Sequence, residues 1–462
     1  MERIYFLFLL FSFFSITACG GGGNNATNDN NSSSESSDKV WGKPVLIENQ
    51  NFFSAVSPQI VSDRNGNTIA IWSQWDGRNY NTWTNRFSAS SGTWGNPTQL
   101  VSLAKYAQIA VDSLGNAFLL WCQYTSVWVN RYDVSTGQWG SATLIASSNV
   151  GDMQSTKIAI DRNGNAMAVW RQSSGGSFVN YRIMASYYEV DRNQWGASTD
   201  LTDYVFGSGA QSKLPQVSFD FNGNAHVVWD KHDGRFGTYT NIWSNRYDVV
   251  SGEWDGAKLL ETENLGNSYN PQIDIDDSGN AIAVWPYSNG TTIDIWSNRY
   301  DANTKQWGTA EPIETNNASL ALNPKIFFDT NGNAISLWVH NDGNGYFYAW
   351  YNRYDVSLAQ WGNADLLYSE YDKIGQINIT NTVDANGNLF VVWRQHIDVD
   401  RGIRSVVACR YDTSTGQWDT PVTIGTGEIE NPKVAIDANG NVTVVWSQYD
   451  GFKHNIWANR FQ

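Results

Sequence analysis

Short apolar runs recur along the chain, each separated from the next by a polar stretch that contains glycine. Runs such as residues 281–285 (AIAVW) and 442–446 (VTVVW) are apolar at nearly every position rather than at alternate positions. A strand with this pattern is buried on both of its faces. The pattern therefore predicts sheets stacked face to face.

Each of these runs follows a turn of the form D-x-x-G-N, in which the aspartate can cap the turn and the glycine supplies positive φ. The turns begin at Asp63, Asp112, Asp161, Asp220, Asp276, Asp329, Asp384 and Asp437. Their spacing of 49 to 59 residues predicts eight repeated units. A calcium loop of the EF-hand type would need an acid at its twelfth position, where residues such as Gln74 and Lys231 stand, so we expect hairpin turns.

A full unit is expected to contain four strands, as illustrated by residues 432–437, 281–285, 295–301 and 138–145 from four of the units. Four-stranded units of this length predict an all-β fold, an eight-bladed β-propeller of four-stranded blades. An open solenoid would need capping repeats. The last unit stops at its third strand, and residues 41–47 (WGKPVLI) match a fourth strand. We expect this N-terminal strand to complete the last blade and close the ring.

Tryptophan follows the same plan. Of the 23 tryptophans, eight end the second strands, eight open the fourth strands and six lie in the third strands. Such large rings are expected in the packing between blades. The exception is Trp75.

The first 18 residues predict an export signal, because Arg3 precedes the apolar stretch 4–14 and small residues follow it. Residues 16–19 (ITAC) resemble the lipobox of bacterial lipoproteins. The resemblance implies that Cys19 is lipidated and becomes the mature N-terminus, and with Gly20 it implies the outer membrane. The alternative is a plain secretory signal. Residues 19–39 are expected to form the lipidated cysteine and a flexible linker, and residues 40–462 a single propeller.

The net charge of -15, with no basic cluster, argues against nucleic acid as a partner. No later apolar run is long enough to cross a bilayer, so membrane contact is expected through the lipid anchor only. The remaining cysteines, Cys122 and Cys409, lie in non-adjacent units and are expected to be buried free thiols. We expect a monomer without a cofactor or a bound metal.

An arginine recurs eight residues before the fourth-strand tryptophan in most units, and we expect it to pair with a repeated aspartate between blades. The turn 132–140 (YDVSTGQWG) is similar to the Asp-box, or BNR repeat, of sialidase-type propellers. Its aspartate stands four residues before the glycine, whereas the family motif has a spacing of two. The resemblance covers the repeat plan of the whole body and implies a structural turn. The sialidase active-site residues have no counterparts that can be placed, so sialidase activity is not implied.

In a propeller, the second-to-third and blade-to-blade loops share one face, and here they are the variable ones. Five second-to-third loops carry aromatic rings beside aspartate, asparagine or histidine: 73–82, 230–241, 339–349, 394–405 and 447–455. A sugar offers an apolar face and a rim of hydroxyls, which such a mixture suits. The candidate ligand-binding residues are Trp75, Tyr80, His232, Tyr239, His340, Tyr346, Tyr348, His396, Tyr449 and His454.

These observations favour a surface lipoprotein that binds an extracellular ligand, with a glycan as the leading candidate. One alternative is a polysaccharide lyase or glycosidase, for which His396 as base with Arg401 and Arg404 is the candidate cluster. Another is a protein-interaction scaffold, and the loops could also simply pack on one another. The histidines would also permit zinc, but no H-x-x-x-H or C-x-x-C spacing supports a metal site.

Overall fold

The computed structural model describes residues 39–48, 53–148, 151–174, 180–202, 211–232, 239–261, 266–314, 320–344, 346–372, 379–398 and 402–462. These residues form strands joined by turns, and none of them lies in a helix, which confirms the all-β class. Accordingly, the same residues include no helix with the length and apolarity needed to span a membrane. The predicted signal, Cys19 and all but the last residue of the predicted linker lie outside the described residues.

The first three strands of the repeat are long and follow one another in fixed order. The first strands are β2 (Ala55–Ser62), β7 (Lys105–Val111), β12 (Met153–Ile160), β17 (Gln211–Phe219), β22 and β23 (Asn267–Ser268 and Gln272–Ile275), β28 (Leu320–Phe328), β33 (Thr380–Val383) and β37 (Val422–Ile436). The second strands are β3 (Thr68–Trp75), β8 (Ala117–Gln123), β13 (Ala166–Ser173), β18 (Ala225–His232), β24 (Ala281–Ser288), β29 (Ala334–Asn341), β34 (Leu389–Asp398) and β38 (Val442–Tyr449). The third strands are β4 (Tyr80–Ser88), β9 (Ser126–Asp133), β14 (Tyr181–Glu189), β19 (Thr240–Asp248), β25 (Ile293–Asp301), β30 (Phe347–Asp355), β35 (Ile403–Asp412) and β39 (His454–Phe461).

The fourth strands differ from the prediction because most are broken into two pieces. The pairs of pieces are β5 and β6 (Thr93–Trp94, Thr98–Ser102), β10 and β11 (Gln138–Trp139, Thr143–Ser147), β15 and β16 (Gln194–Trp195, Thr199–Asp200), β20 and β21 (Glu253–Trp254, Lys258–Leu259), β26 and β27 (Gln306–Trp307, Glu311–Pro312), and β31 and β32 (Gln360–Trp361, Asp365–Asp372). After β36 (Gln417–Trp418), the second piece is the start of β37, which pairs with both β35 and β38. In the gap after β10, Gly140 N still donates to Arg131 O (2.8 Å), so the chain stays paired across the break.

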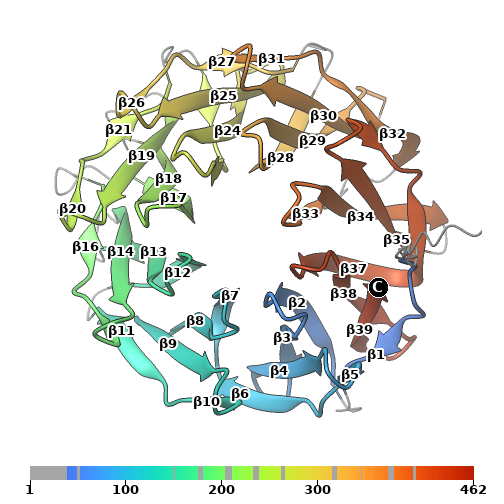
Figure 1. Ribbon diagram of the computed structural model, residues 1–462. Helices are drawn as coiled ribbons and strands as arrows, with labels where there is room; N and C mark the ends of the chain where they lie inside the picture. Colours follow the sequence, from blue (N-terminus) through green and yellow to red (C-terminus); the bar gives the residue numbers. More distant parts are fainter. Residues whose placement is uncertain are drawn as a thin grey trace, which may run out of the picture. The chain divides into compact units, whose positions relative to one another are not determined.

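Within each repeat, antiparallel pairing joins the first strand to the second, the second to the third and the third to the fourth. The first strands also contact one another in the order β2, β7, β12, β17, β23, β28, β33 and β37, and β37 contacts β2. Figure 1 shows these strands around a central axis, with the fourth strands outermost. Sheets stacked radially in this way make a β-propeller.

The two ends of the propeller chain pair with each other. β1 (Val45–Leu46) is antiparallel to β39, with Val45 opposite Ala458 and Leu46 opposite Trp457. Trp41 forms an isolated bridge with Phe461, and their ring centroids are 5.4 Å apart. This is the strand pairing that residues 41–47 predict.

The core lies between adjacent sheets. The tryptophans that end the second strands are each at most 1% exposed: Trp72, Trp121, Trp170, Trp229, Trp285, Trp338, Trp393 and Trp446. The repeated tryptophans of the third and fourth strands are only half-buried. Cys122 and Cys409 are buried and free, as predicted. Of the repeated tryptophans, those that end the second strands are therefore the ones fully buried in the core.

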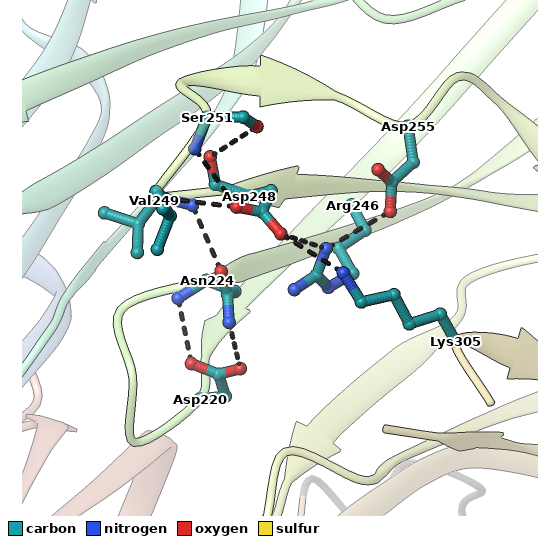
Figure 2. Close-up of polar contacts among 9 residues, drawn as sticks. Asp220, Asn224, Arg246, Asp248, Val249, Ser251, Asp255 and Lys305 are labelled. Carbon is teal, nitrogen blue, oxygen red and sulfur yellow. Dashed lines mark hydrogen bonds and ion pairs between the residues drawn. The ribbon is translucent and has the colours of Figure 1, made fainter. Parts of the chain in front are cut away.

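Asp220 illustrates why the D-x-x-G-N turn repeats (Figure 2). Its carboxylate accepts hydrogen bonds from Asn222 N (2.8 Å), Asn224 N (2.8 Å) and Asn224 Nδ2 (2.7 Å). Asn224 Oδ1 in turn accepts from Val249 N (3.1 Å), which ties this turn to the turn between the third and fourth strands. Gly223 has φ of 88°. The motif is therefore a structural turn, as predicted.

The predicted arginine pairing between blades is wrong. Arg246 Nη1 lies 3.1 Å from Asp248 Oδ2 and 3.3 Å from Asp255 Oδ2, both in its own blade (Figure 2). The same own-strand pairing recurs at Arg131–Asp133, Arg299–Asp301, Arg353–Asp355 and Arg410–Asp412. Residues i and i+2 of a strand face the same side, which brings each arginine beside its own aspartate. Between blades, arginine meets a ring instead, as Arg460 does over Phe87 (3.9 Å).

Candidate functional site

The predicted second-to-third loops consist mostly of strand. β3 runs to Trp75 and β4 begins at Tyr80, so only residues 76–79 form the turn. The candidate residues therefore lie at strand ends, where pairing fixes their neighbours. The cross-strand pairs are Trp75 with Tyr80, His232 with Thr240, His340 with Tyr348, His396 with Arg404, and Tyr449 with His454.

In the first blade, Trp75 and Tyr80 form a tilted ring pair beside a charged turn. Their ring centroids are 5.0 Å apart. The carboxylate of Asp76 accepts hydrogen bonds from Asn79 N (2.7 Å), Arg78 N (2.8 Å) and Asn81 Nδ2 (2.7 Å). These donors, with the Asn79 amide foremost, lower the pKa of Asp76. The turn therefore presents an ionised carboxylate next to two aromatic rings at neutral pH.

The last blade repeats this arrangement with Tyr449 and His454, whose ring centroids are 5.3 Å apart. Asp450 accepts from Lys453 N (3.0 Å), Phe452 N (2.9 Å) and Asn455 Nδ2 (2.8 Å). The Lys453 amide leads the donors that lower the pKa of Asp450. Two blades thus carry the same combination of ring pair and ionised turn.

Ser54 links the two ring pairs. Ser54 O accepts from Trp75 N (3.0 Å), and Ser54 Oγ accepts from His454 N (3.2 Å). These contacts place the ring pairs on neighbouring blades around one serine. We call the surface formed by Phe53, Trp75, Tyr80, Tyr449, Phe452 and His454 the aromatic rim.

Much of the aromatic rim faces water. Phe452 is 94% exposed, Tyr80 47% and Phe53 40%, while Trp75, Tyr449 and His454 are half-buried. Gly77 permits close approach of the Phe53 ring, since a Cβ at this position would lie 3.1 Å from Phe53 Cζ. Exposed rings of this number on adjacent loops are typical of a binding surface.

The sequence interpretation missed four exposed aromatic residues of this region. Phe53 and Phe452 belong to the aromatic rim, and Tyr106 (50% exposed) and Tyr124 (75% exposed) lie in the neighbouring blade of β7–β11. Tyr106 and Tyr124 both have positive φ, at 55° and 54°. Phe452 could have been found, because it stands directly after the Asp-Gly turn that the sequence singles out.

His340 does not lie at the surface. It is 3% exposed, its Nε2 is 3.2 Å from Glu314 Oε1, and its ring packs against Trp350 at 5.8 Å. Burial lowers the pKa of His340 and raises that of Glu314 to about 8. Burial therefore favours the neutral form of both groups, and His340 is an interior residue without access to a surface ligand.

Four other candidate residues are half-buried on two blades away from the aromatic rim. They are His232 and Tyr239 on the blade of β17–β21, and Tyr346 and Tyr348 on the blade of β28–β32. The first strands of those blades, β17 and β28, are separated from β2 and β37 in the order of contacts. The structure therefore does not gather all the predicted residues into one site.

His396 and Arg404 contact each other directly. Arg404 Nε donates to His396 Nε2 (2.9 Å), and Arg404 Nη1 lies 3.5 Å from Glu430 Oε1. The lone pair of Nε2 is therefore already occupied, so this nitrogen is not free to abstract a proton from a substrate. The third member of the predicted cluster, Arg401, lies outside the described residues. This geometry counts against His396 as the base of a lyase.

Across the described ranges, no group of three or more histidine, cysteine, aspartate or glutamate side chains is placed to hold a metal ion. Hollows of about 590 Å³ and 450 Å³ lie between outer strands, away from the aromatic rim. Both are lined by fourth-strand tryptophans, Trp139 and Trp195 in the larger and Trp195 and Trp254 in the smaller. They are therefore features of the repeat rather than of one blade.

No family model matches the sequence, and no curated protein matches it. Among solved structures, the chain is similar to the Dos1 propeller, with a TM-score of 0.52 and 10% identity over 92% of this chain and 95% of that one. It is also similar to the WD40 domain of SCAP from fission yeast, with a TM-score of 0.51 and 10% identity over 91% and 94%. The polysaccharide lyase Uly1 matches with a TM-score of 0.49 and 9% identity over 87% and 89%. At such identities the likeness to the Dos1 propeller and the SCAP WD40 domain shows the β-propeller fold alone.

Proposed function

We propose that the protein is an exported, lipid-anchored β-propeller of eight blades, closed by β1, which binds a glycan at the aromatic rim. The eight-blade reading is supported by the eight second-strand tryptophans and by the order of contacts among the first strands. Closure is supported by the pairing of β1 with β39. The anchor is proposed at Cys19, in a bacterial outer membrane, on the strength of the sequence ITAC alone.

The observation that carries the glycan proposal is the joining of two ring pairs through Ser54. Each pair lies beside an ionised aspartate whose turn is held rigid by its own hydrogen bonds. Aromatic faces take up the apolar side of a pyranose, while carboxylate and imidazole groups bond its hydroxyls. Because the pairs lie on adjacent blades, the aromatic rim suits two or more linked sugar units.

Substituting Trp75 by alanine is expected to weaken glycan binding about tenfold or more, because the loss of an aromatic anchor in an interface typically costs above 1.4 kcal/mol. The measurement is a screen of the soluble propeller, residues 39–462, on glycan and polysaccharide arrays, followed by calorimetric titration of the hits. Tyr80→Ala and Tyr449→Ala are expected to behave like Trp75→Ala.

The matched control is Phe221→Ala, which removes another exposed aromatic ring (45% exposed) from the turn between β17 and β18. Binding that survives Trp75→Ala and Tyr449→Ala would place the ligand elsewhere. Growth of unsaturated-uronate absorbance during the screen would instead reveal a lyase. Absence of any glycan hit, with a protein captured by the aromatic rim, would favour a scaffold.

The lipid anchor is tested separately. In a Gram-negative host, the full chain is expected to incorporate an alkyne-tagged palmitate and to fractionate with outer membranes, because only a cysteine thiol at the lipobox accepts the lipid. Cys19→Ser is expected to abolish the label while leaving the propeller folded. Label that persists in Cys19→Ser, or is absent from the wild type, contradicts the anchor without touching the glycan proposal.

A further inference from the structure

One position of the first strands forms a polar ring around the propeller axis. It lies four residues before the aspartate of each D-x-x-G-N turn. The residues at this position are Gln59, Gln108, Lys157, Gln216, Gln272, Lys325, Thr380 and Lys433. They stand at equivalent positions of the repeat, on the strands that surround the axis in Figure 1.

A backbone feature recurs beside that position. The residue two positions before the ring position has positive φ in every blade where it is described: Ser57, Tyr106, Ser155, Leu214, Asn270, Asn323 and Asn431, with φ from 47° to 55°. The pairing of first and second strands shifts register there in most blades. Bulges of this kind re-aim the side chains that follow them. A shared bulge therefore sets the ring residues at a common height.

Three of the ring residues are lysines on strands that are not neighbours. Lys157 is on β12, Lys325 on β28 and Lys433 on β37, so they stand three, two and three strands apart around the axis. The positive charges of Lys433 and Lys157 both act on Lys325 and, after burial, help to lower its pKa to about 8. Lys157, Lys325 and Lys433 thus occupy the same repeat position on three of the strands that surround the axis, and we call them the lysine ring.

No carboxylate compensates these charges among the described residues. The contact of the lysine ring that the structure records is from Lys325 Nζ to Gln272 Oε1 (3.2 Å). Asp274, two residues along β23 from Gln272, instead accepts from Phe328 N (3.0 Å), and burial raises its pKa to about 6. All three lysines are half-buried. Enclosed like charges are costly unless an opposite charge joins them.

We propose that Lys157, Lys325 and Lys433 bind a tetrahedral oxyanion, a phosphate or sulfate group, on the propeller axis. Three ammonium groups spread around an axis suit an anion whose oxygens point in several directions better than they suit a planar carboxylate. Lysine serves such groups as a point charge. Ring glutamines line the same level as polar neighbours. The group is either a free ion or the acidic substituent of a larger ligand, and the site is independent of the aromatic rim.

The test titrates inorganic phosphate and inorganic sulfate into the full chain by calorimetry, with thermal unfolding in parallel. We expect saturable binding at one site and a melting temperature that rises with anion concentration. Lys325→Gln is expected to weaken binding at least tenfold. Glutamine occupies four of the ring positions already, so this variant is expected to fold. In anion-free buffer it should melt no lower than the wild type, because it removes repulsion.

Lys305→Gln, which removes an exposed lysine outside the ring, is the matched control and is expected to bind like the wild type. A sulfated disaccharide and a sugar phosphate, titrated in the same way, separate a free ion from an ester group by whichever binds more tightly. Trp75→Ala should retain anion binding, so failure of the glycan proposal is distinguishable. Absence of saturable binding at millimolar anion, or binding that Lys325→Gln leaves unchanged, overturns the proposal.

Discussion

Removal of residues 1–48 is expected to destabilise the propeller by roughly 5 kcal/mol or more, from the apolar burial and hydrogen bonds that β1 supplies. Ile47 is 2% exposed and packs in one cluster with Ala435, Val445 and Ile456. Ile47 N donates to Ile456 O (3.0 Å), and Gly42 N donates to Arg460 O (2.8 Å). Without β1, β39 becomes an open edge, and part of this cluster is exposed to water.

The matched control is removal of residues 1–38 alone, which leaves β1 in place. The free energies of unfolding and melting temperatures of the two truncated proteins are compared by urea unfolding and differential scanning calorimetry. We expect the shorter truncation to unfold like the full chain and the longer one to melt at least about 6 °C lower. Equal melting temperatures for the two would mean that β1 contributes nothing to the ring.

Raising the pH from about 5 to about 9 is expected to lower the free energy of unfolding, and Glu314→Gln is expected to remove much of that loss. Burial raises the pKa of Glu314 from 4.5 to about 8. A group with a raised pKa in the folded state stabilises the fold fully below its unfolded pKa and loses that contribution as pH climbs through the folded pKa. The shift corresponds to an upper limit of roughly 5 kcal/mol.

The measurement is urea unfolding of wild type and Glu314→Gln at pH values between 5 and 9. The free energy of unfolding of the variant is still expected to fall somewhat with rising pH, because burial also raises the pKa of Glu261 to about 7. The exposed Glu253→Gln serves as control and is expected to follow the wild type. If the free energy of unfolding changed with pH to the same extent in the wild type and in Glu314→Gln, Glu314 would be ionised in the folded protein. His340 would then be its charged partner.

The fold could be predicted because its determinants are local and repeated. Asp220 and Asn224 form hydrogen bonds within their own turn and to the neighbouring turn. The sequence of a single unit is therefore enough to recognise the motif. The match of residues 41–47 to a fourth strand is likewise a comparison of short segments. The aspartate partner of each arginine was also readable from the sequence, since the two stand at i and i+2 of one strand. Spacing along one strand does not reveal the aromatic ring that faces the arginine from the next blade.

The candidate site was predicted only in part, because burial depends on neighbouring blades. His340 and His454 both flank an Asp-Gly turn, His340 before it and His454 after it, yet Glu314, which follows β27 of the preceding blade, lies against the first. Tyr106 and Tyr124 look in sequence like the many core aromatics of the chain. The members of the lysine ring share a position four residues before their turn aspartates, but spacing alone does not show that this position lies on strands around an axis. The three lysines are scattered over 277 positions, from Lys157 to Lys433, and share one ring only once the strands surround an axis.

Hydrogen exchange at the N-terminal strand tests the closed ring most directly. The amides of Gly42 and Ile47 donate to Arg460 and Ile456 across the junction of the two chain ends. A closed ring predicts that the peptide covering residues 40–48 exchanges as slowly as the one covering β38, because both open only with the fold. Exchange of residues 40–48 at the rate of an unstructured peptide, while β38 stays protected, would contradict closure.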